Sequence, residues 1–380
     1  MIRWFVKYGF VIFLFNTIFY SISLTKDTIA PIVFYITMAT GLFFLLLNPK
    51  HLKEVLFHKA FLFLMILNLI NLTYYLFFDS ISNIDSLEYL MARFMSFSLI
   101  SLSIYYNFSF FKNRFTSMIV KIISLVVFLS LIIDPNLLNG RYHGIIWNPN
   151  MLASLTVLSF SCILLKTKEK SPFEKLLLIL LLIVSLSTGS RSAIIAIGLS
   201  FIFKYGFSLR NVLYSLTGVM LIFMISNTNL ETSLNRITSQ GIMKGRVEQF
   251  NFAIYNIKEK IFTGHGLSEY SGLPSDIDIP KRLEGIFIAA HNGYLSILIQ
   301  YGIIFGGLVI LIIFTKSFEL FSFYIRRNDE NLVYVFFIVY TLFAANFESL
   351  ITGINEFHTI LFWFSISYLS YSKFLEDHAD

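Results

Sequence analysis

Long apolar runs, separated by polar connections, occupy almost the whole chain. A helix that crosses the hydrocarbon of a bilayer needs about 20 predominantly apolar residues. The runs predict twelve such spans, at residues 4–23, 28–48, 60–78, 89–111, 116–134, 150–166, 173–189, 191–206, 209–226, 290–315, 331–350 and 356–374. The runs are far longer than barrel strands, and lipid requires backbone groups to bond internally. We therefore expect an all-α membrane protein, with residues 1–380 forming a single integral membrane domain.

The stretch between Lys175 and Lys204 allows two interpretations. Arg191 is its only charge, and the apolar runs on either side of it are short for a span. One long helix here would reverse the orientation of everything downstream. Residues 187–192 are rich in turn formers, which favours a hairpin of two short helices instead. Short helices would leave their turn in a water-filled depression below the outer surface.

One long connection, residues 227–289, interrupts the pattern. Between Arg246 and Phe262 its apolar residues recur with the period of a helix, and Gly264 follows as a stop signal. The predicted apolar face consists of Val247, Phe250, Ile254, Ile257 and Ile261. We expect an amphipathic helix that lies on the outer membrane surface with this face toward the lipid.

The basic residues indicate the orientation of the spans. If the N-terminus is cytoplasmic, eighteen Lys and Arg residues fall on the inner side, against four in the short outer connections and outer helix ends: Lys26, Arg93, Arg141 and Arg191. This bias follows the positive-inside rule. Both termini are then expected in the cytoplasm, and the 227–289 loop outside it.

The composition agrees with a chain dissolved in lipid. Hydrophobic residues make up 56%, charged residues 14%, and the mean hydropathy is +0.72. The net charge of +6 therefore reports membrane topology rather than nucleic-acid binding. Cys162 is the single cysteine, so no disulfide framework is expected. The first apolar run continues as a full span, which argues against a cleavable signal peptide.

His291 is the first candidate for chemistry, because it stands where the long outer loop meets the tenth span. Histidine is the side chain whose ordinary pKa suits proton transfer near neutral pH. A polar residue that merely ends a loop is the plainer interpretation. Gly302 and Gly306 share its helix face and form a small-xxx-small pair, which predicts close approach of another helix and a His291 that faces protein.

Two arginines are candidates for anion binding. Arg191 lies in the predicted hairpin turn, and its guanidinium offers forked donors that match phosphate oxygens. Arg246 begins the predicted surface helix, from which it can reach back over the membrane domain. The plainer interpretations are an interfacial arginine that marks a helix end and a solvated charge on a polar helix face.

Other polar groups on the outer side are less specific. The connection from Arg141 to Asn150 carries amides and aromatic rings that suit sugars, although Asn148 and Pro149 equally form a turn and a helix cap. Asp276 and Asp278 match a metal-binding pattern of nucleotide-sugar enzymes, which we discount because three residues match by chance. Arg93, Glu348 and Glu356 are outer-half charges that either pair structurally or line a cavity. The chain has no P-loop, HExxH or GxSxG motif, so a pump driven by ATP and a metallohydrolase have no support.

Taken in order, these stretches resemble the O-antigen ligase and O-antigen polymerase superfamily of bacterial envelope glycosyltransferases. The resemblance rests on Thr188–Ala193, on the segment from Arg246 to Gly264-His265-Gly266, on His291-Asn292 followed by Gly302, and on the stretch from Gly140-Arg141 to Asn148-Pro149-Asn150. It covers motif order and topology over about residues 140–310. Phe305 departs from the pattern, where members often have a small residue or tyrosine, which weakens the helix-packing inference more than the chemical one.

The resemblance implies a metal-independent glycosyltransferase of polysaccharide biosynthesis in the bacterial inner membrane, without a cofactor. Its donor would be a glycan linked to undecaprenyl diphosphate, and its acceptor a hydroxyl of another glycan or lipid-linked sugar. Arg191 and Arg246 would hold the diphosphate, and His291 would act as general base or orient the acceptor. Arg141, Asn148, Asn150, His265 and Asn292 are expected to contact the substrates. Besides membrane lipid, other polysaccharide-assembly proteins are candidate partners.

Two acceptors remain possible for such an enzyme, and two other protein classes, a transporter and a scaffold protein, remain as alternatives. A polymerase, which we favour, adds the growing chain to another lipid-linked repeat unit, whereas a ligase moves the finished chain to lipid A–core or another acceptor. A secondary transporter should show internal repeats and charges near the midplane of the bilayer, which the sequence lacks. A scaffold protein would let Arg191, Arg246 and His291 diverge in space, whereas an enzyme requires them around one outward cavity.

Overall fold

A computed structural model describes the chain except for residues 1, 80–82, 138–140, 207, 227–239, 271, 274–289, 328 and 379–380. In the described part the regular structure is helical, apart from an isolated antiparallel bridge between Ile22 and Ile146. The helices are α1 (Ile2–Phe19), α2 (Ile29–Leu47), α3 (Pro49–Leu56), α4 (Leu62–Phe78), α5 (Ile84–Ile133), α6 (Pro149–Leu165), α7 (Pro172–Ser187), α8 (Arg191–Tyr205), α9 (Leu209–Ser226), α10 (Gln240–Glu259), the short η2 (Leu267–Glu269), α11 (Gly293–Tyr324), α12 (Leu332–Ala344) and α13 (Phe357–Asp377).

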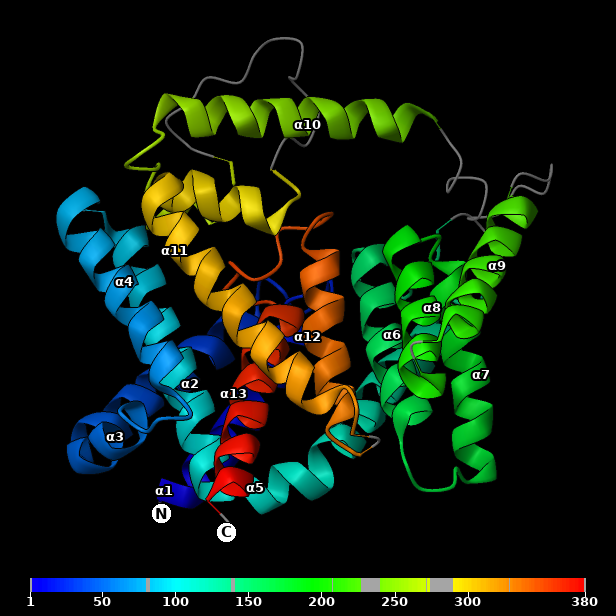
Figure 1. Cartoon of the computed structure of the whole chain (residues 1–380), viewed down its shortest axis with the longest axis horizontal. Coiled ribbons are helices and arrows are strands. Elements are labelled where there is room, and N and C mark those ends of the chain that lie inside the picture. The colour runs from blue at the N-terminus through cyan, green and yellow to red at the C-terminus, as the bar shows by residue number, and fades with distance from the viewer. Residues whose placement is uncertain are drawn as a thin grey trace.

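The helices stand side by side, with α10 lying across one end of them (Figure 1). Both chain termini lie at the opposite end, which agrees with the predicted arrangement of two termini on one side and the long loop on the other (Figure 1). Which end faces the cytoplasm stays a prediction. The end that carries α10 is called the α10 end below, and the opposite one the terminal end.

By length and composition, three of the described helices, α2, α5 and α11, are able to cross a membrane. α4, α6 and α12 are shorter apolar helices. Large apolar side chains also face outward, such as Ile32 with 60% of its surface exposed and Leu311 with 62%, as contact with lipid requires and water disfavours. The chain is an all-α membrane protein, while the number of twelve spans stays a prediction.

Local signals in the sequence fix several helix ends near the predicted positions. Asn148 caps α6 and Pro149 occupies its first turn. Ser171 and Glu174 form a capping box at the start of α7, so two backbone donors are bonded reciprocally. α7 ends at Ser187 and α8 begins at Arg191, which confirms two short helices rather than one long one.

Two predicted spans, 89–111 and 116–134, belong to the single continuous element α5. The chain does not leave the helix between them, and only Asn107 has non-helical backbone angles, at φ −131° and ψ 30°. The side-chain amide of Asn107 donates to the backbone carbonyl of Arg3. The predicted loop at residues 112–115 is therefore helical, and the chain instead bends at Asn107, so the two halves of α5 point in different directions (Figure 1). The short helix α3 was also not predicted.

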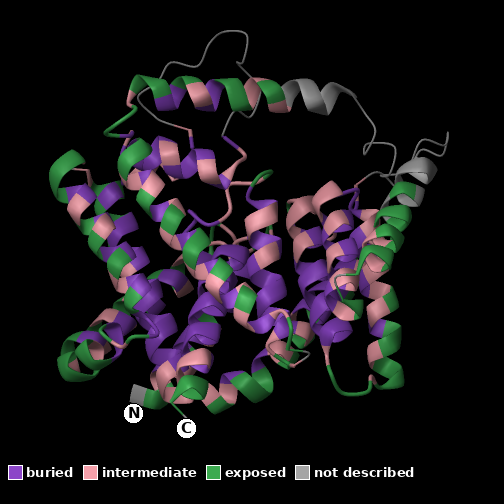
Figure 2. Cartoon of the chain, viewed as in Figure 1, coloured by how far each residue is buried: buried purple, intermediate pink, exposed green. Residues whose placement is uncertain are grey.

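Aromatic side chains fill the interior between α1, α5, α12 and α13. Phe10, Phe115 and Phe364 are fully buried and lie ring against ring, with centroids of Phe115 and Phe364 only 4.2 Å apart. Figure 2 shows buried residues concentrated in the centre of the molecule. Such packed rings contribute large buried areas, and they make this part of the chain a rigid support for the helix ends above it.

Part of the predicted apolar face of the surface helix packs on protein, and its contact with lipid stays a prediction. α10 packs on the start of α11 through Ala253 and Ile257, which join a small core with Ala290 and Ile299. Val247, Phe250 and Ile261 of the predicted stripe are instead exposed. The helix rests on protein through its C-terminal half, so the buried face is set by α11 rather than by a flat lipid surface.

The predicted role of Gly302 and Gly306 in helix–helix packing is wrong. Gly302 breaks α11 with a φ of +71°, and a Cβ there would lie 2.5 Å from the carbonyl oxygen of Phe262. A Cβ on Gly306 would meet the carbonyl oxygen of Ile297 in the same helix at 3.1 Å. The two glycines therefore accommodate a bend and the loop after α10, because the atoms nearest to the two Cβ positions belong to that loop and to α11 itself.

Substituting Gly302→Ala is expected to lower the free energy of unfolding by about 1–3 kcal/mol, because the left-handed conformation and the clash with Phe262 both penalise a side chain. Gly307→Ala is a matched control, since a Cβ there meets nothing within 4 Å. Thermal denaturation of the detergent-solubilised protein measures both. If Gly302→Ala has the same melting temperature as Gly307→Ala, the structural reason given for this kink is contradicted.

The eleventh predicted span is too long. α12 ends at Ala344, and residues 345–356 form an irregular connection to α13. The backbone amide of Gly293 donates to the carbonyl of Ala345 at 2.7 Å. Arg93, which is 3% exposed, donates to the carbonyls of Ile351 and Thr352. Because these partners bond the backbone of the connection, it does not need to be helical, and it carries Glu348 to the α10 end.

Candidate functional site

A cavity of about 410 Å³ opens at the α10 end and brings together the three residues to which the sequence assigns chemistry. Arg191, Arg246 and His291 all line it. The other lining residues are Arg141, Asn150, Gly189, Ser190, Ser192, Ile195, Phe250, Ala290, Asn292, Asn346, Phe347 and Glu348. Segments far apart in the sequence thus meet in one place, as the enzyme interpretation requires and the scaffold interpretation does not.

Arg191 reaches the cavity because the turn between α7 and α8 is tight. Gly189 has a φ of +63°, a conformation that glycine adopts without the penalty of a Cβ. The backbone carbonyl of Thr188 accepts a hydrogen bond from Nε of Arg141 at 3.0 Å. The backbone amide of Tyr142 donates to Ser187 at 3.1 Å. The connection before α6 therefore holds the turn that presents Arg191.

Three helices begin at this cavity. Asn150 lies in the first turn of α6, Arg191 is the first residue of α8, and Asn292 is the N-cap of α11. The N-terminal end of each helix carries a partial positive charge and backbone N–H groups without partners inside the helix. At α8 the N-cap Ser190 makes no capping hydrogen bond with its side chain. Helix starts of this kind attract anions.

Arg246 approaches from α10. Its Nη1 donates to the carbonyl of Phe347 at 2.8 Å, and its Nη2 lies 3.9 Å from a carboxylate oxygen of Glu348. The guanidinium therefore bridges α10 and the connection after α12. This position over the cavity matches the prediction that Arg246 reaches back over the membrane domain.

His291 lies at the start of α11 against Glu348. Its Nδ1 is 3.4 Å from Oε2 of Glu348, and both side chains are partly exposed to the cavity. The residue has a φ of +43°, in the left-handed region where non-glycine residues are uncommon. Backbone held in this way often marks a functional position. A carboxylate on one ring nitrogen selects the tautomer that leaves the other nitrogen as an acceptor.

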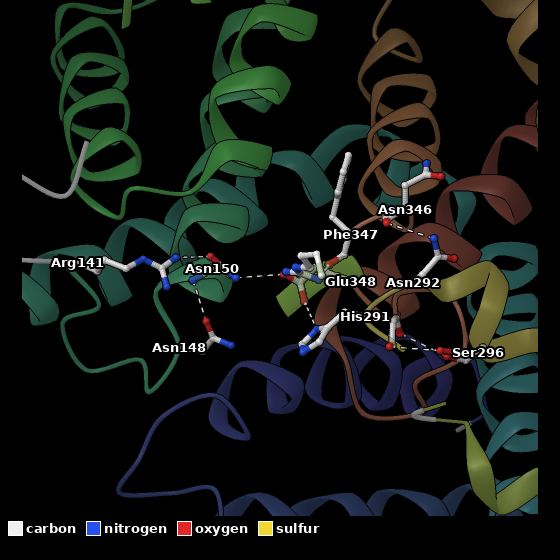
Figure 3. A network of polar contacts seen from close by, with 12 residues as sticks. Arg141, Asn148, Asn150, His291, Asn292, Ser296, Asn346, Phe347 and Glu348 are labelled. Carbon is white, nitrogen blue, oxygen red and sulfur yellow. Dashed lines mark hydrogen bonds and ion pairs between the residues drawn. The ribbon is translucent and has the colours of Figure 1, made fainter. Parts of the chain in front are cut away.

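Glu348 also ends a chain of polar contacts that crosses the cavity (Figure 3). The side-chain amide of Asn150 donates to Oε1 of Glu348 at 3.0 Å, and Arg141 donates to the carbonyl oxygen of the same amide. Glu348 therefore touches a histidine, an arginine and an asparagine from three different segments. It is the residue that couples the two walls of the cavity.

The sequence left the role of Glu348 undecided between a structural ion pair and the cavity. The sequence predicts one helix over residues 331–350, so it assigns Glu348 a helical geometry that the chain does not have there. The run Asn346-Phe347-Glu348-Ser349, three polar residues within four at the outer end of an apolar stretch, was the available signal that the span ends earlier.

The remaining predicted substrate-binding residues divide into two groups. Arg141, Asn150 and Asn292 line the cavity. Asn292 also caps α11 by accepting from the amides of Tyr294 and Leu295, each at 3.0 Å. Asn148 and His265 are not among its described lining residues. Asn148 accepts from the backbone amide of Asn150, and Nε2 of His265 contacts the carbonyl of Asn256 at 2.9 Å, so we assign both a structural role.

The cavity is cationic. Among its described lining residues three are arginines, one is a histidine and one, Glu348, is acidic. The fixed positive ends of the helices add to this charge. An anion with several oxygen atoms therefore fits the cavity better than a neutral sugar alone. Asp276 and Asp278, the discounted metal pattern, lie outside the described residues.

Comparison with known families agrees with this geometry. Residues 176–312 match a family model described as O-antigen ligase. This segment is similar to the O-antigen ligase family, which supports the O-antigen ligase and polymerase superfamily. The matched segment contains Arg191, Arg246 and His291, whereas Arg141, Asn150 and Glu348 lie outside it. No curated protein matches the chain. The resemblance seen in the sequence is confirmed over this segment, and the family indicates in general a membrane glycosyltransferase of O-antigen assembly.

Proposed function

We propose that this chain transfers a glycan from undecaprenyl diphosphate to a hydroxyl group of an acceptor sugar at the α10 end, which we take as the extracytoplasmic side. The observation that carries the proposal is the meeting of Arg191, Arg246 and His291 around one cavity. The family match supports the reaction class. The donor already carries the energy of the diphosphate linkage, so the proposed reaction needs no ATP, cofactor or metal.

The diphosphate of the donor would occupy the cationic part of the cavity. Arg191 and Arg246 supply guanidinium groups, and the N-terminal end of α8 supplies backbone donors. As the bond between the anomeric carbon and the diphosphate breaks, negative charge grows on the leaving oxygen. Donors that are already in place stabilise this charge without a reorganisation cost.

The acceptor would approach His291. Its Nδ1 faces Glu348, so the imidazole keeps a proton on that nitrogen and offers Nε2 as base. The acceptor oxygen attacks the anomeric carbon, its proton moves to Nε2, and undecaprenyl diphosphate leaves with the electron pair of the broken bond. Glu348 stabilises the imidazolium that forms, which is the role of a carboxylate beside a catalytic histidine.

A second cavity suits the polyprenyl chain of the donor. It has a volume of about 410 Å³ and lies between α7, α8 and α9. Leu182, Leu186, Ile194 and Ile197 are among its lining residues. Because α8 contributes Arg191 to the first cavity and Ile194 to the second, a lipid whose diphosphate contacts Arg191 would find an apolar surface within the next turn of the same helix.

The position of the charged cavity favours a transferase over a transporter. It is built from the first residues of α6, α8 and α11 and from the connection after α12, at one end of the helices. A transporter binds its substrate near the midplane, at broken helices of two structural repeats. A cavity at the membrane surface instead suits a lipid-linked donor whose sugar extends into water.

The direct test is a reaction of the purified protein with lipid-linked repeat units. We favour a polymerase, for which a ladder of increasing chain lengths is the expected product. Transfer in a single step to a different lipid would identify a ligase. Absence of any transfer to either acceptor, with protein that is folded and binds the donor, would overturn the proposal of a glycosyltransferase.

Substituting Glu348→Gln is expected to lower kcat by at least about 100-fold, because an amide leaves the imidazolium of His291 without its counter-charge and permits the wrong tautomer. The substitution preserves the size of the side chain and an oxygen that accepts from Asn150. Glu88→Gln is a suitable control, since its carboxylate accepts a hydrogen bond from Tyr35 outside the cavity. The rate of transfer at saturating donor measures the effect, and a kcat equal to that of Glu88→Gln would show that Glu348 is not needed.

A further inference from the structure

A separate cavity of about 400 Å³ lies at the terminal end, where the function proposed above has no role for it. Its walls come from the middle of α5, the end of α6, the connection to α7 and the first turns of α12. α6 and α12 each have one end at the candidate site and the other end here. The two cavities therefore lie at opposite ends of the same helices.

The mouth of this cavity at the terminal end is basic. Lys112, Lys166 and Lys168 line it, together with Glu174 and Glu330. Glu174 is bonded to Lys166 at 2.7 Å and to the backbone amide of Ser171 at 2.9 Å, so its charge is largely compensated. Lys112 and Lys168 are exposed, and among the described residues no carboxylate forms an ion pair with either of them.

More lysines surround the same mouth. Nζ of Lys204 donates to the backbone carbonyl of Lys166 at 3.3 Å. Lys170 lies in the same connection, and its pKa is lowered, first by burial and then by the charge of Lys204. The neighbouring charges of Lys170 and Lys204 create a positive potential, and an anion that binds between them relieves the repulsion.

The interior of the cavity offers hydroxyl groups. Tyr334 lines it and is 2% exposed, and its hydroxyl has no hydrogen-bond partner among the described residues. Thr116 and Ser117 contribute two more hydroxyls to the lining. A buried donor without a partner costs free energy unless a ligand supplies an acceptor. Apolar side chains such as Val120 and Val333 complete the wall.

We propose that this cavity binds a phosphate ester, with the phosphate between Lys112 and Lys168 and an ester or hydroxyl oxygen at Tyr334. Lysines bind phosphate as point charges, and the mixture of hydroxyl and apolar groups suits the glycerol part of an anionic phospholipid. The same chemistry is offered by a soluble phosphate ester, and the two sources differ only in the presence of acyl chains.

Native mass spectrometry of the full-length protein in neutral detergent tests the proposal by counting bound ligands. The probes are dioctanoylphosphatidylglycerol, dioctanoylphosphatidylcholine and glycerol 1-phosphate. We expect one saturable site for phosphatidylglycerol that phosphatidylcholine does not fill. Glycerol 1-phosphate that binds with the same Kd would identify a soluble ester as the ligand, and weaker binding would identify the lipid.

Two variants assign the site. The double substitution Lys112→Gln and Lys168→Gln is expected to raise the Kd roughly 30-fold, since each lysine near an anionic headgroup contributes a factor of about five. Tyr334→Phe is expected to raise it roughly fivefold through the lost hydrogen bond to a neutral oxygen. Lys53→Gln removes an exposed lysine of α3 outside the cavity and serves as the matched control. Equal binding by the double variant and Lys53→Gln, or no saturable site in the wild type, would overturn the proposal.

Discussion

Substituting His291→Ala is expected to lower the rate of glycan transfer by about 100- to 10,000-fold, the range that general-base catalysis contributes. The methyl group of alanine removes both the base toward the acceptor and the partner of Glu348, whose nearest oxygen is 3.4 Å from the imidazole. Donor binding should change little, because Arg191 and Arg246 remain. Single-turnover transfer with purified protein gives the rate, and the length of glycan chains in cells gives an independent readout at equal expression.

His265→Gln is the matched control for this experiment. The imidazole of His265 contacts the carbonyl of Asn256 outside the cavity, and glutamine retains a donor for that contact. We expect transfer close to the wild-type rate. Normal glycan chains in the His291→Ala variant would rule out both the base and the orienting role. A comparable loss of the transfer rate in His265→Gln would show that the support of α10, rather than the chemistry of the His291 imidazole, limits the reaction.

Substituting Arg191→Lys is expected to lower kcat/KM by about 100-fold or more, because the loss of a preorganised donor to developing charge has an effect of this size. Lysine keeps the charge at the start of α8 but lacks the forked donors that match two phosphate oxygens. Transfer rates at several donor concentrations separate binding from the chemical step. A loss in kcat indicates stabilisation of the leaving diphosphate, and a loss confined to KM indicates binding alone.

Arg210→Lys provides the control for Arg191→Lys. Arg210 is the second residue of α9 and is exposed, so the same chemical change there should leave transfer unaffected. Full activity of Arg191→Lys would argue against bidentate phosphate recognition. Arg191→Ala would then distinguish a simple charge requirement from no requirement at all.

The sequence predicts most of the helices because their signals are local. An apolar run, a proline in the first turn and a capping residue lie within a few positions of one another, as at Asn148 and Pro149 for α6. Where a contact between distant segments determines the backbone conformation, the prediction from the sequence is wrong. The kink at Asn107 and the bend at Gly302 depend on Arg3 and Phe262, which are distant in the sequence.

The candidate site shows the same division between local signals, which the sequence reveals, and contacts between distant segments, which it does not. His291 and Arg191 are recognisable because each stands at the edge of an apolar run. The contacts of Glu348 with His291, Asn150 and Arg246 join residues from separate parts of the chain, and no spacing in the sequence predicts them. The cap function of Asn148 and the packing position of His265 are likewise set by the folded chain, so residue type alone does not separate a substrate ligand from a structural support.

The residues of the candidate site have separate origins along the chain. Arg191, Arg246 and His291 fall within residues 176–312, and Arg141, Asn150 and Glu348 fall outside. Exchanging the flanking helices for those of a relative, with Glu348 retained, would therefore keep the reactive groups but change the surface on which an incoming sugar rests. Chimaeric proteins of this kind offer a way to redirect the glycan accepted without rebuilding the chemistry.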